Sequence, residues 1–406
     1  MNIAILTPAW PAGAAPNGIA TYYDNLVPAM AALGHKIIVL TAMRNSGDNN
    51  DTDNIHVYEL PKKLGRLSYW RMRIGETFEP GHLSKAYGAA QIIEALELAQ
   101  REHQIDLLQM EESFGWHQGV RERFDFPVVA RLHGPHFLNA SKDMGGAQSS
   151  EDNYRVKGEG EALSKAIAVT APSNDVMLHT KNFYNLEWDH AAVFPNPVRV
   201  DEAQPQWSLD GCDRNEILFV GRFDRHKGGD ILLEAFIAVA EARPEVRLVF
   251  AGPDRGIVDE TGERRQIEFF LQEMSQDVRE RVKFLGQLSR SEIKALRTKA
   301  FVTVVSSRYE TFGNVVIEAM ACGCPVVATN TGGIAEIIDA EETGALVPAG
   351  DASALANRLI QAFDSLKETA AMGAKAYEVV RERFDPERIA RDHLRFFQQV
   401  ISSQEQ

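Results

Sequence analysis

The stretch FVTVVSSRYETFGNVVIEAMACGCPVVAT, residues 301–329, holds one complete connection between two strands. Its apolar start and its apolar end, VVAT, have the length and composition of buried strands. The run between them predicts a helix from Asn314 to Cys322, because Gly323 followed by Pro325 is typical of a helix C-terminus. The order strand, helix, strand predicts a parallel α/β sheet.

The same alternation runs through both halves of the chain. The predicted strands of the first half are NIAILT, KIIVLTA, IDLLQM, PVVARLHG and AIAVTAPS. The second half restarts with EILFVGRF and continues with VRLVFAGP and VKFLGQ. Apolar runs without polar alternation, separated by helices, indicate parallel strands that are covered on both faces. We therefore expect an α/β protein with two doubly wound, Rossmann-like domains.

A proline-rich segment separates the two halves. FPNPVRVDEAQPQW, residues 194–207, has three prolines and several polar residues, which is typical of an interdomain linker. We expect an N-terminal domain over residues 1–196 and a C-terminal domain over residues 197–385. A final amphipathic stretch, at about 386–406, follows after the second sheet should be complete.

Composition excludes several classes of protein. The net charge of −14 argues against a general nucleic-acid binder, which needs clustered Lys and Arg. Three cysteines, Cys212, Cys322 and Cys324, provide no disulfide framework and are expected as small buried side chains in a reducing compartment. The opening MNIAILTPAW predicts a strand, and no apolar run approaches the roughly 18 residues of a membrane span. We expect a cytoplasmic protein.

Two cations follow the predicted strand EILFV. Arg222 and Lys227 lie in the loop GRFDRHKGGD, directly before a predicted helix. Ligands of open α/β sheets bind beyond the carboxyl ends of the strands. Arg as a bidentate fork and Lys as a mobile point charge can together neutralise a pyrophosphate. Taken alone, the motif fits a solvated basic turn equally well.

Two carboxylates flank the start of the predicted helix in the opening stretch. Glu310 precedes this helix and Glu318 lies in its second turn. The helix start would present backbone amides to an anion. Because like charge repels phosphate, the two glutamates are expected to hold hydroxyl groups at either end of one ligand. The amides concerned belong to Phe312, Gly313, Asn314 and Val315.

Together these motifs resemble the retaining, family-4-type glycosyltransferases of the GT-B fold (glycosyl transferases group 1). The order and spacing of GRFDRHKG, ETFGNVVIEAMACGCPVVAT, TGGIAEII and TGALVPAGD match over residues 221–351. Weaker matches in the first half are NGIATYYDNLVPAMAALGHKIIVLT, ARLHG, APS and FPNPV. The resemblance implies two domains that face each other across a cleft, with a C-terminal helix that crosses back to the first.

The resemblance also implies roles for the motif residues. Arg222 and Lys227 would hold the donor diphosphate and stabilise the nucleotide leaving group. Glu318 would hold ribose hydroxyls and Glu310 the donor sugar. The backbone amides at the helix start would contact sugar and phosphate.

Two further residues are carried over in the first domain. His133, in RLHG, would reach the donor sugar, and Gly18, in PNG, would approach the phosphate or the acceptor. PNG departs from the two adjacent glycines of many relatives. The linker reads NPVRVD rather than NGVD, and Asn196 is the residue that would be carried over there. Beside these, Glu111, Glu112 and His136 also follow predicted strands, and an acceptor-side or a surface role is open for each.

The implied activity is that of a retaining hexosyltransferase without a metal ion or a resident cofactor. The expected donor is a UDP- or GDP-sugar, and the acceptor is a hydroxyl of a glycan, a lipid-linked compound or a small molecule. We expect same-face attack by the acceptor, since no protein nucleophile is evident. A sugar-nucleotide epimerase and a catalytically silent sugar-nucleotide-binding protein are the alternatives.

A basic and aromatic segment allows contact with a membrane. KKLGRLSYWRMR, residues 62–73, carries five basic residues, two large aromatic residues and no acidic residue. It could place the protein on the inner face of a membrane or contact a lipid-linked acceptor. A solvated loop is the alternative. The sequence leaves the oligomeric state open.

Overall fold

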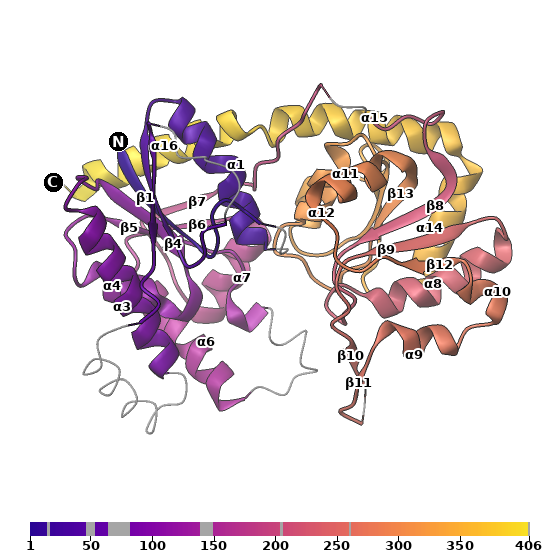
Figure 1. Cartoon of the computed structure of the whole chain (residues 1–406), viewed down its shortest axis with the longest axis horizontal. Coiled ribbons are helices and arrows are strands. Elements are labelled where there is room, and N and C mark those ends of the chain that lie inside the picture. The colour runs from indigo at the N-terminus through magenta and orange to yellow at the C-terminus, as the bar shows by residue number, and fades with distance from the viewer. Residues whose placement is uncertain are drawn as a thin grey trace. The chain divides into compact units, whose positions relative to one another are not determined.

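We describe the protein from a computed structural model. The residues described are 1–13, 17–45, 53–63, 82–138, 149–203, 206–259 and 261–404. The segment 62–73 falls outside them except for Lys62 and Lys63. The chain divides into two compact units (Figure 1). Unit 1 is Met1–Pro197 with Pro386–Gln406, and unit 2 is Val198–Asp385.

Unit 1 contains a parallel sheet of seven described strands in the order β3-β2-β1-β4-β5-β6-β7. The strands are β1 (Asn2–Thr7), β2 (Lys36–Thr41), β3 (Ile55–Glu59), β4 (Leu107–Glu111), β5 (Val128–Arg131), β6 (Ala168–Ala171) and β7 (His190–Val193). The two edge strands, β3 and β7, are additions to the predicted set. They are only partly buried, so they lack the long apolar runs that indicated the central strands.

Helices cover both faces of the unit 1 sheet. Alternate residues of β1 and β2 pack with α1 and α16 on one face, and with α3 and α4 on the other. Here α1 is Gly18–Ala32, α3 is His82–Ala99, α4 is Trp116–Arg121 and α16 is Pro386–Gln404. The remaining helices are η1 (Ser113–Gly115), α6 (Ser150–Leu163) and α7 (Asn174–Tyr184). The amphipathic C-terminal stretch is therefore a helix that returns to the first unit (Figure 1).

Unit 2 contains a second parallel sheet, of six described strands in the order β12-β9-β8-β13-β14-β15. The strands are β8 (Asp213–Val220), β9 (Arg247–Ala251), β12 (Val282–Phe284), β13 (Ala300–Val305), β14 (Val326–Thr329) and β15 (Ala345–Val347). A short antiparallel pair, β10 (Ile257–Val258) and β11 (Arg264–Arg265), lies apart from it. The predicted doubly wound α/β architecture of both halves is confirmed.

Unit 2 has eight described helices. They are α8 (Gly229–Ala242), α9 (Ile267–Gln272), α10 (Gln276–Arg279), α11 (Arg290–Lys299), α12 (Asn314–Met320), α13 (Ile334–Ile337), α14 (Ala352–Asp364) and α15 (Leu366–Arg383). The segment RQIEFFLQEMSQ, residues 265–276, enters two short helices, because the Ser275 side chain caps a new helix at α10. Helix α12 ends before Cys322, at Met320. Of the three free cysteines, Cys322 and Cys324 are buried, whereas Cys212 is half-buried.

The strand order reverses once in each sheet. In unit 1 the reversal lies between β1 and β4, and in unit 2 between β8 and β13. Loops after the two strands diverge at such a point and leave room at the carboxyl ends, where ligands of open α/β sheets bind. Each unit therefore has one position that its topology favours for a ligand.

Candidate functional site

The loop between β8 and α8 occupies the reversal point of unit 2. Asp224 organises this loop, since its Oδ2 accepts a hydrogen bond of 2.6 Å from Arg222 Nε and its Oδ1 accepts one of 2.8 Å from the backbone N–H of Lys227. The Arg222 side chain is still 44% exposed. The two predicted phosphate ligands are thus held in one loop by one carboxylate.

A close backbone contact joins this loop to the end of β13. Gly228 has a φ of +68°, and a Cβ added there would lie 1.9 Å from the carbonyl oxygen of Ser306. The Ser306 hydroxyl in turn donates to the carbonyls of Lys227 and Gly228, at 3.1 and 2.9 Å. Glycine is required here because a side chain would separate the two loops.

Lys227 and Glu310 meet across the reversal point. Lys227 Nζ donates to Glu310 Oε1 at 2.5 Å, and Ser307 Oγ donates to the same oxygen at 2.7 Å. Burial by itself would raise the pKa of Glu310, but the Lys227 charge and these hydrogen bonds lower it below its ordinary value. Glu310 Oε2 has no hydrogen-bond partner among the described residues. One oxygen is therefore fixed, and the other can accept from a ligand hydroxyl.

A second ion pair braces the same two loops. Arg308, two residues before Glu310, donates to both oxygens of Asp230 in the first turn of α8, at 2.8 and 2.7 Å. The Arg308 backbone N–H also donates to the carbonyl of His226. This bidentate pair was not predicted, because 78 residues separate its partners along the chain. It fixes the loops rather than providing a free charge.

The start of α12 combines a glycine of positive φ with a buried phenylalanine. Gly313 has a φ of +112° and precedes the first helical residue, Asn314. The Phe312 side chain is buried and its ring meets that of Phe384 at 5.9 Å between centroids. Only the backbone of Phe312 is thereby left for a ligand. The predicted donor contacts of Phe312, Gly313, Asn314 and Val315 remain predictions.

Glu318, the second carboxylate, has a partner of its own. Arg297 of α11 donates through Nη2 to Glu318 Oε2 at 2.7 Å. Arg297 is buried, whereas about a third of the Glu318 side chain, 32%, is exposed. This pair was not predicted from the sequence. The predicted ribose contact of Glu318 remains a prediction, to be made by its exposed side.

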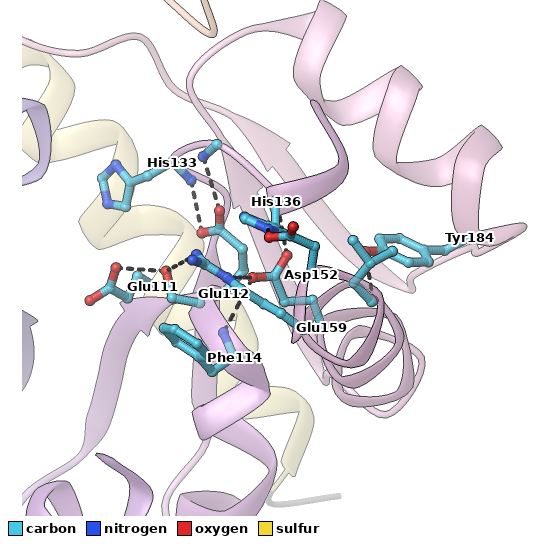
Figure 2. Close-up of polar contacts among 12 residues, drawn as sticks. Glu111, Glu112, Phe114, His133, His136, Asp152, Glu159 and Tyr184 are labelled. Atoms are coloured by element: carbon cyan, nitrogen blue, oxygen red, sulfur yellow. Dashed lines mark hydrogen bonds and ion pairs between the residues drawn. The ribbon is translucent and has the colours of Figure 1, made fainter. Parts of the chain in front are cut away.

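In unit 1, Glu112 holds the loop that follows β5. Its Oε2 accepts from the backbone N–H of His133 at 3.0 Å and its Oε1 from that of Gly134 at 2.9 Å (Figure 2). Burial raises the pKa of Glu112 to about 8, and the charge of Glu159 adds to this rise. Glu111 and Glu112 are both buried, so neither has the surface role that the sequence allowed.

A second buried carboxylate, Glu159 of α6, also holds the loop that follows β5. It accepts hydrogen bonds from the backbone N–H of His136 at 2.8 Å, from that of Phe114 at 3.3 Å and from Arg155 Nε at 2.8 Å (Figure 2). The His136 ring contacts Asp152 at 2.6 Å. His136 is therefore held by two acidic residues of one helix.

The His133 ring is enclosed by aromatic residues. It meets the rings of Tyr22 and Tyr23 edge-on, at centroid distances of 5.2 and 5.9 Å. Its Nε2 is buried and has no hydrogen-bond partner among the residues described. Burial, with the charge of Arg131, lowers the pKa of His133 well below its ordinary value, so the ring is neutral at pH 7.

Comparison with known proteins places these features in a family. Residues 16–202 match the family described as Glycosyltransferase Family 4, and residues 201–379 match Glycosyl transferases group 1. The chain belongs to the family-4-type glycosyltransferases. Its fold is that of the GT-B members of this family.

Two curated relatives of this chain are enzymes named for inositol compounds. The phosphatidyl-myo-inositol mannosyltransferase of Mycobacterium leprae is 33% identical over 220 residues, which are 52% of this chain and 54% of that protein. The D-inositol 3-phosphate glycosyltransferase of Mycobacteroides abscessus is 29% identical over 317 residues, 73% of this chain and 62% of that protein. The matches thus span less than two thirds of either relative.

Solved structures match over nearly the whole chain. Sucrose-phosphate synthase from Thermosynechococcus elongatus has a TM-score of 0.75 at 25% identity, and the match covers 99% of both chains. Anabaena HepE, in complex with UDP-glucose, has a TM-score of 0.65 at 19% identity and covers 99% of this chain and 100% of its own. At that identity the likeness to HepE shows the fold alone. Among the described helices, none is long and apolar enough to cross a membrane.

Gly18 and Asn196, which were also carried over from the family, lie at positions with local hydrogen bonds. Gly18 is the exposed first residue of α1, and the neighbouring Asn17 side chain accepts from the N–H groups of Ile19 and Ala20. A phosphate at this helix start would have to replace Asn17, and the predicted contact of Gly18 remains a prediction. Asn196 is buried and accepts from Arg131 Nη2 at 3.0 Å, so it anchors β5.

Proposed function

We propose that the protein transfers a hexosyl group from a nucleoside-diphosphate sugar to a hydroxyl acceptor, with retention of configuration and without a metal ion. The Lys227–Glu310 pair at the reversal point of unit 2, with the exposed Arg222 in the same loop, carries this proposal. Family membership supports sugar transfer, and the UDP-glucose complex of HepE supports a nucleotide-sugar donor.

The cations of this site would act on the leaving group. As the bond between the anomeric carbon and the diphosphate oxygen breaks, negative charge develops on the diphosphate. Lys227 keeps two further N–H groups beside the one that it donates to Glu310, and Arg222 presents an exposed guanidinium. Charges that are already in position stabilise a developing anion without reorganisation in the transition state.

Glu310 would bind the donor sugar rather than attack it. Its Oε1 is occupied by Lys227 and Ser307, and its Oε2 can accept one sugar hydroxyl. A carboxylate with two hydrogen bonds and a lowered pKa is a weak nucleophile. We therefore favour attack by the acceptor on the same face of the sugar, with the acceptor proton passing to the departing phosphate oxygen. The proposed contact of the neutral His133 with the donor sugar and that of Glu318 with ribose belong to the same scheme.

The decisive experiment begins with a thermal-shift screen of the full chain against UDP-, GDP- and ADP-sugars. A bound donor at roughly 100 times its Kd should raise the free energy of unfolding by about 2.7 kcal/mol. NMR analysis of the product formed with the stabilising donor, with and without EDTA, then tests transfer, retention and metal independence. An isomerised sugar formed without acceptor would show an epimerase. Binding without turnover on any acceptor of a broad panel would show a silent binding protein.

A further inference from the structure

A cavity of about 460 Å³ opens at the strand reversal of unit 1. Its wall includes Leu6 at the end of β1, Ile92 of α3 and Trp116 of α4, together with Leu60 and Tyr87. The volume lies within the range of about 300–1,000 Å³ that is usual for small-molecule sites. The cavity thus occupies in unit 1 the position that the Lys227–Glu310 pair occupies in unit 2.

Glu111 adds a charged group to this mainly apolar wall. It is the last residue of β4 and only 9% exposed. Ser113 Oγ donates to its Oε2 at 3.0 Å (Figure 2). Arg155 Nη2 in turn donates to Ser113 Oγ at 3.5 Å. Oε1 has no hydrogen-bond partner among the described residues. Burial raises the pKa of Glu111, so a ligand hydroxyl would relieve an unfavourable environment.

Trp116 is held in place at the wall of the cavity. Its ring stacks on that of Phe114, with centroids 5.1 Å apart and planes 20° apart. It also lies against Gly88 of α3, where an added Cβ would be 2.4 Å from Trp116 Cε2. Because Trp116 is already fixed by these contacts, the part of it that lines the cavity offers an apolar surface at little entropic cost.

These features select the chemical class of the ligand. A pyranose or cyclitol ring has an apolar C–H face that fits an aromatic ring and hydroxyls that a carboxylate accepts. A phosphate would be repelled, because Glu111 is the only charged side chain among the described residues that line the cavity. An uncharged ring with several hydroxyls can contact Trp116 through its C–H groups and donate a hydrogen bond to Glu111.

We propose that this cavity binds an uncharged polyhydroxylated ring, with its C–H groups in contact with Trp116 and a hydroxyl donating to Glu111 Oε1. Its identity as the acceptor rests on the proposed function, since sugar transfer requires an acceptor hydroxyl. The binding itself does not depend on that function. The phosphorylated compounds named for the curated relatives would be disfavoured in this cavity.

The test uses phenyl β-D-glucopyranoside as the probe, titrated into the full chain by ligand-observed NMR. We expect saturable binding, weakened about tenfold by Glu111→Gln, which keeps the shape but loses the charge. Ala42→Trp, at an exposed position of the cavity wall, should abolish binding. Glu97→Gln, an exposed substitution on α3, is the matched control and should leave the affinity unchanged. No binding, or binding that Ala42→Trp leaves intact, would overturn the proposal.

A charged analogue of the probe tests the chemical class. The 6-phosphate should bind more weakly than the neutral glucoside, because Glu111 is the one charged side chain among the described residues that line the cavity. Tighter binding of the phosphate would show a cationic site and would contradict the proposal.

Donor binding, measured in parallel, separates this inference from the proposed function. If the probe binds as expected while no nucleotide sugar stabilises the chain, the glycosyltransferase proposal fails and the cavity assignment stands. If a donor is bound and consumed but the probe is not bound in the cavity, the cavity assignment alone fails. Where transfer to the probe is detected, Glu111→Gln should raise the KM for the probe more than it lowers kcat.

Discussion

Lys227 and Glu310 lie 83 residues apart in the chain, and their side chains meet at 2.5 Å. The first follows β8 and the second follows β13, the two strands between which the unit 2 sheet reverses its order. The topology thereby places a cation and a carboxylate together at the position that open α/β sheets use for ligands.

Removal of the Lys227 ammonium should slow catalysis far more than it weakens nucleotide binding. We expect Lys227→Ala to lower kcat by about 100-fold or more, because the charge acts on the developing diphosphate anion. Steady-state kinetics and nucleotide titration on the same preparation measure the two effects. Lys367→Ala, at an exposed position of α15, is the control. Unchanged turnover in Lys227→Ala would rule out the leaving-group role.

The Lys227–Glu310 pair should make the free energy of unfolding depend on pH. Because the folded-state pKa of Glu310 is lowered, the pair stabilises the folded chain above the ordinary pKa, and this contribution is lost as the pH falls through the lowered value. Lys227→Met leaves a buried carboxylate without its cation and should cost about 1–3 kcal/mol at neutral pH. Urea unfolding at pH 7 and pH 4 tests this, since the loss of unfolding free energy caused by Lys227→Met should be smaller at pH 4. An equal loss of unfolding free energy at pH 7 and pH 4 would contradict this prediction.

Glu112 should have the opposite pH dependence. Its pKa is raised to about 8 in the folded chain from an ordinary 4.5, so its effect on stability becomes more unfavourable as the pH rises between these values. Glu112→Gln should make the free energy of unfolding less dependent on pH between 4.5 and 8. It should also lower stability at pH 5, because an amide offers one acceptor oxygen to the two N–H groups of His133 and Gly134. Glu122→Gln, at an exposed position just after α4, is the control for unfolding at pH 5, 6.5 and 8.

Gly228 should tolerate alanine much less well than another left-handed glycine of unit 2. Gly350 has a φ of +80° and open space around its missing Cβ, so Gly350→Ala should cost only the backbone penalty of about 1–2 kcal/mol. Gly228→Ala adds a contact of 1.9 Å with the Ser306 carbonyl and should cost clearly more. Chemical unfolding of both variants gives the comparison, and equal losses would show that the loops can separate freely.

The Arg308–Asp230 pair should depend on the shape of guanidinium as well as on its charge. Arg308→Ala should lower the free energy of unfolding by about 1–2 kcal/mol. Arg308→Lys should restore only part of this, because an ammonium cannot bind both oxygens of Asp230 in a planar fork. Full rescue by lysine would show that charge alone matters.

The sequence by itself determined the two parallel α/β units, the helix that starts at Asn314 and the family motifs around Arg222, Lys227 and Glu310. These features depend on local patterns, since buried strands need continuous apolar runs and a helix start needs a particular backbone. The edge strands β3 and β7 were missed because exposure removes that pattern.

The tertiary structure alone decided which side chains meet. Arg297 with Glu318, Glu112 with the His133 backbone, and Arg308 with Asp230 join elements that are distant in the chain. It also decided that Glu111 closes one side of a cavity instead of facing solvent. Such pairings follow from strand order and packing, which set distances between residues, whereas the spacing of residues along the chain sets only which face of an element they occupy.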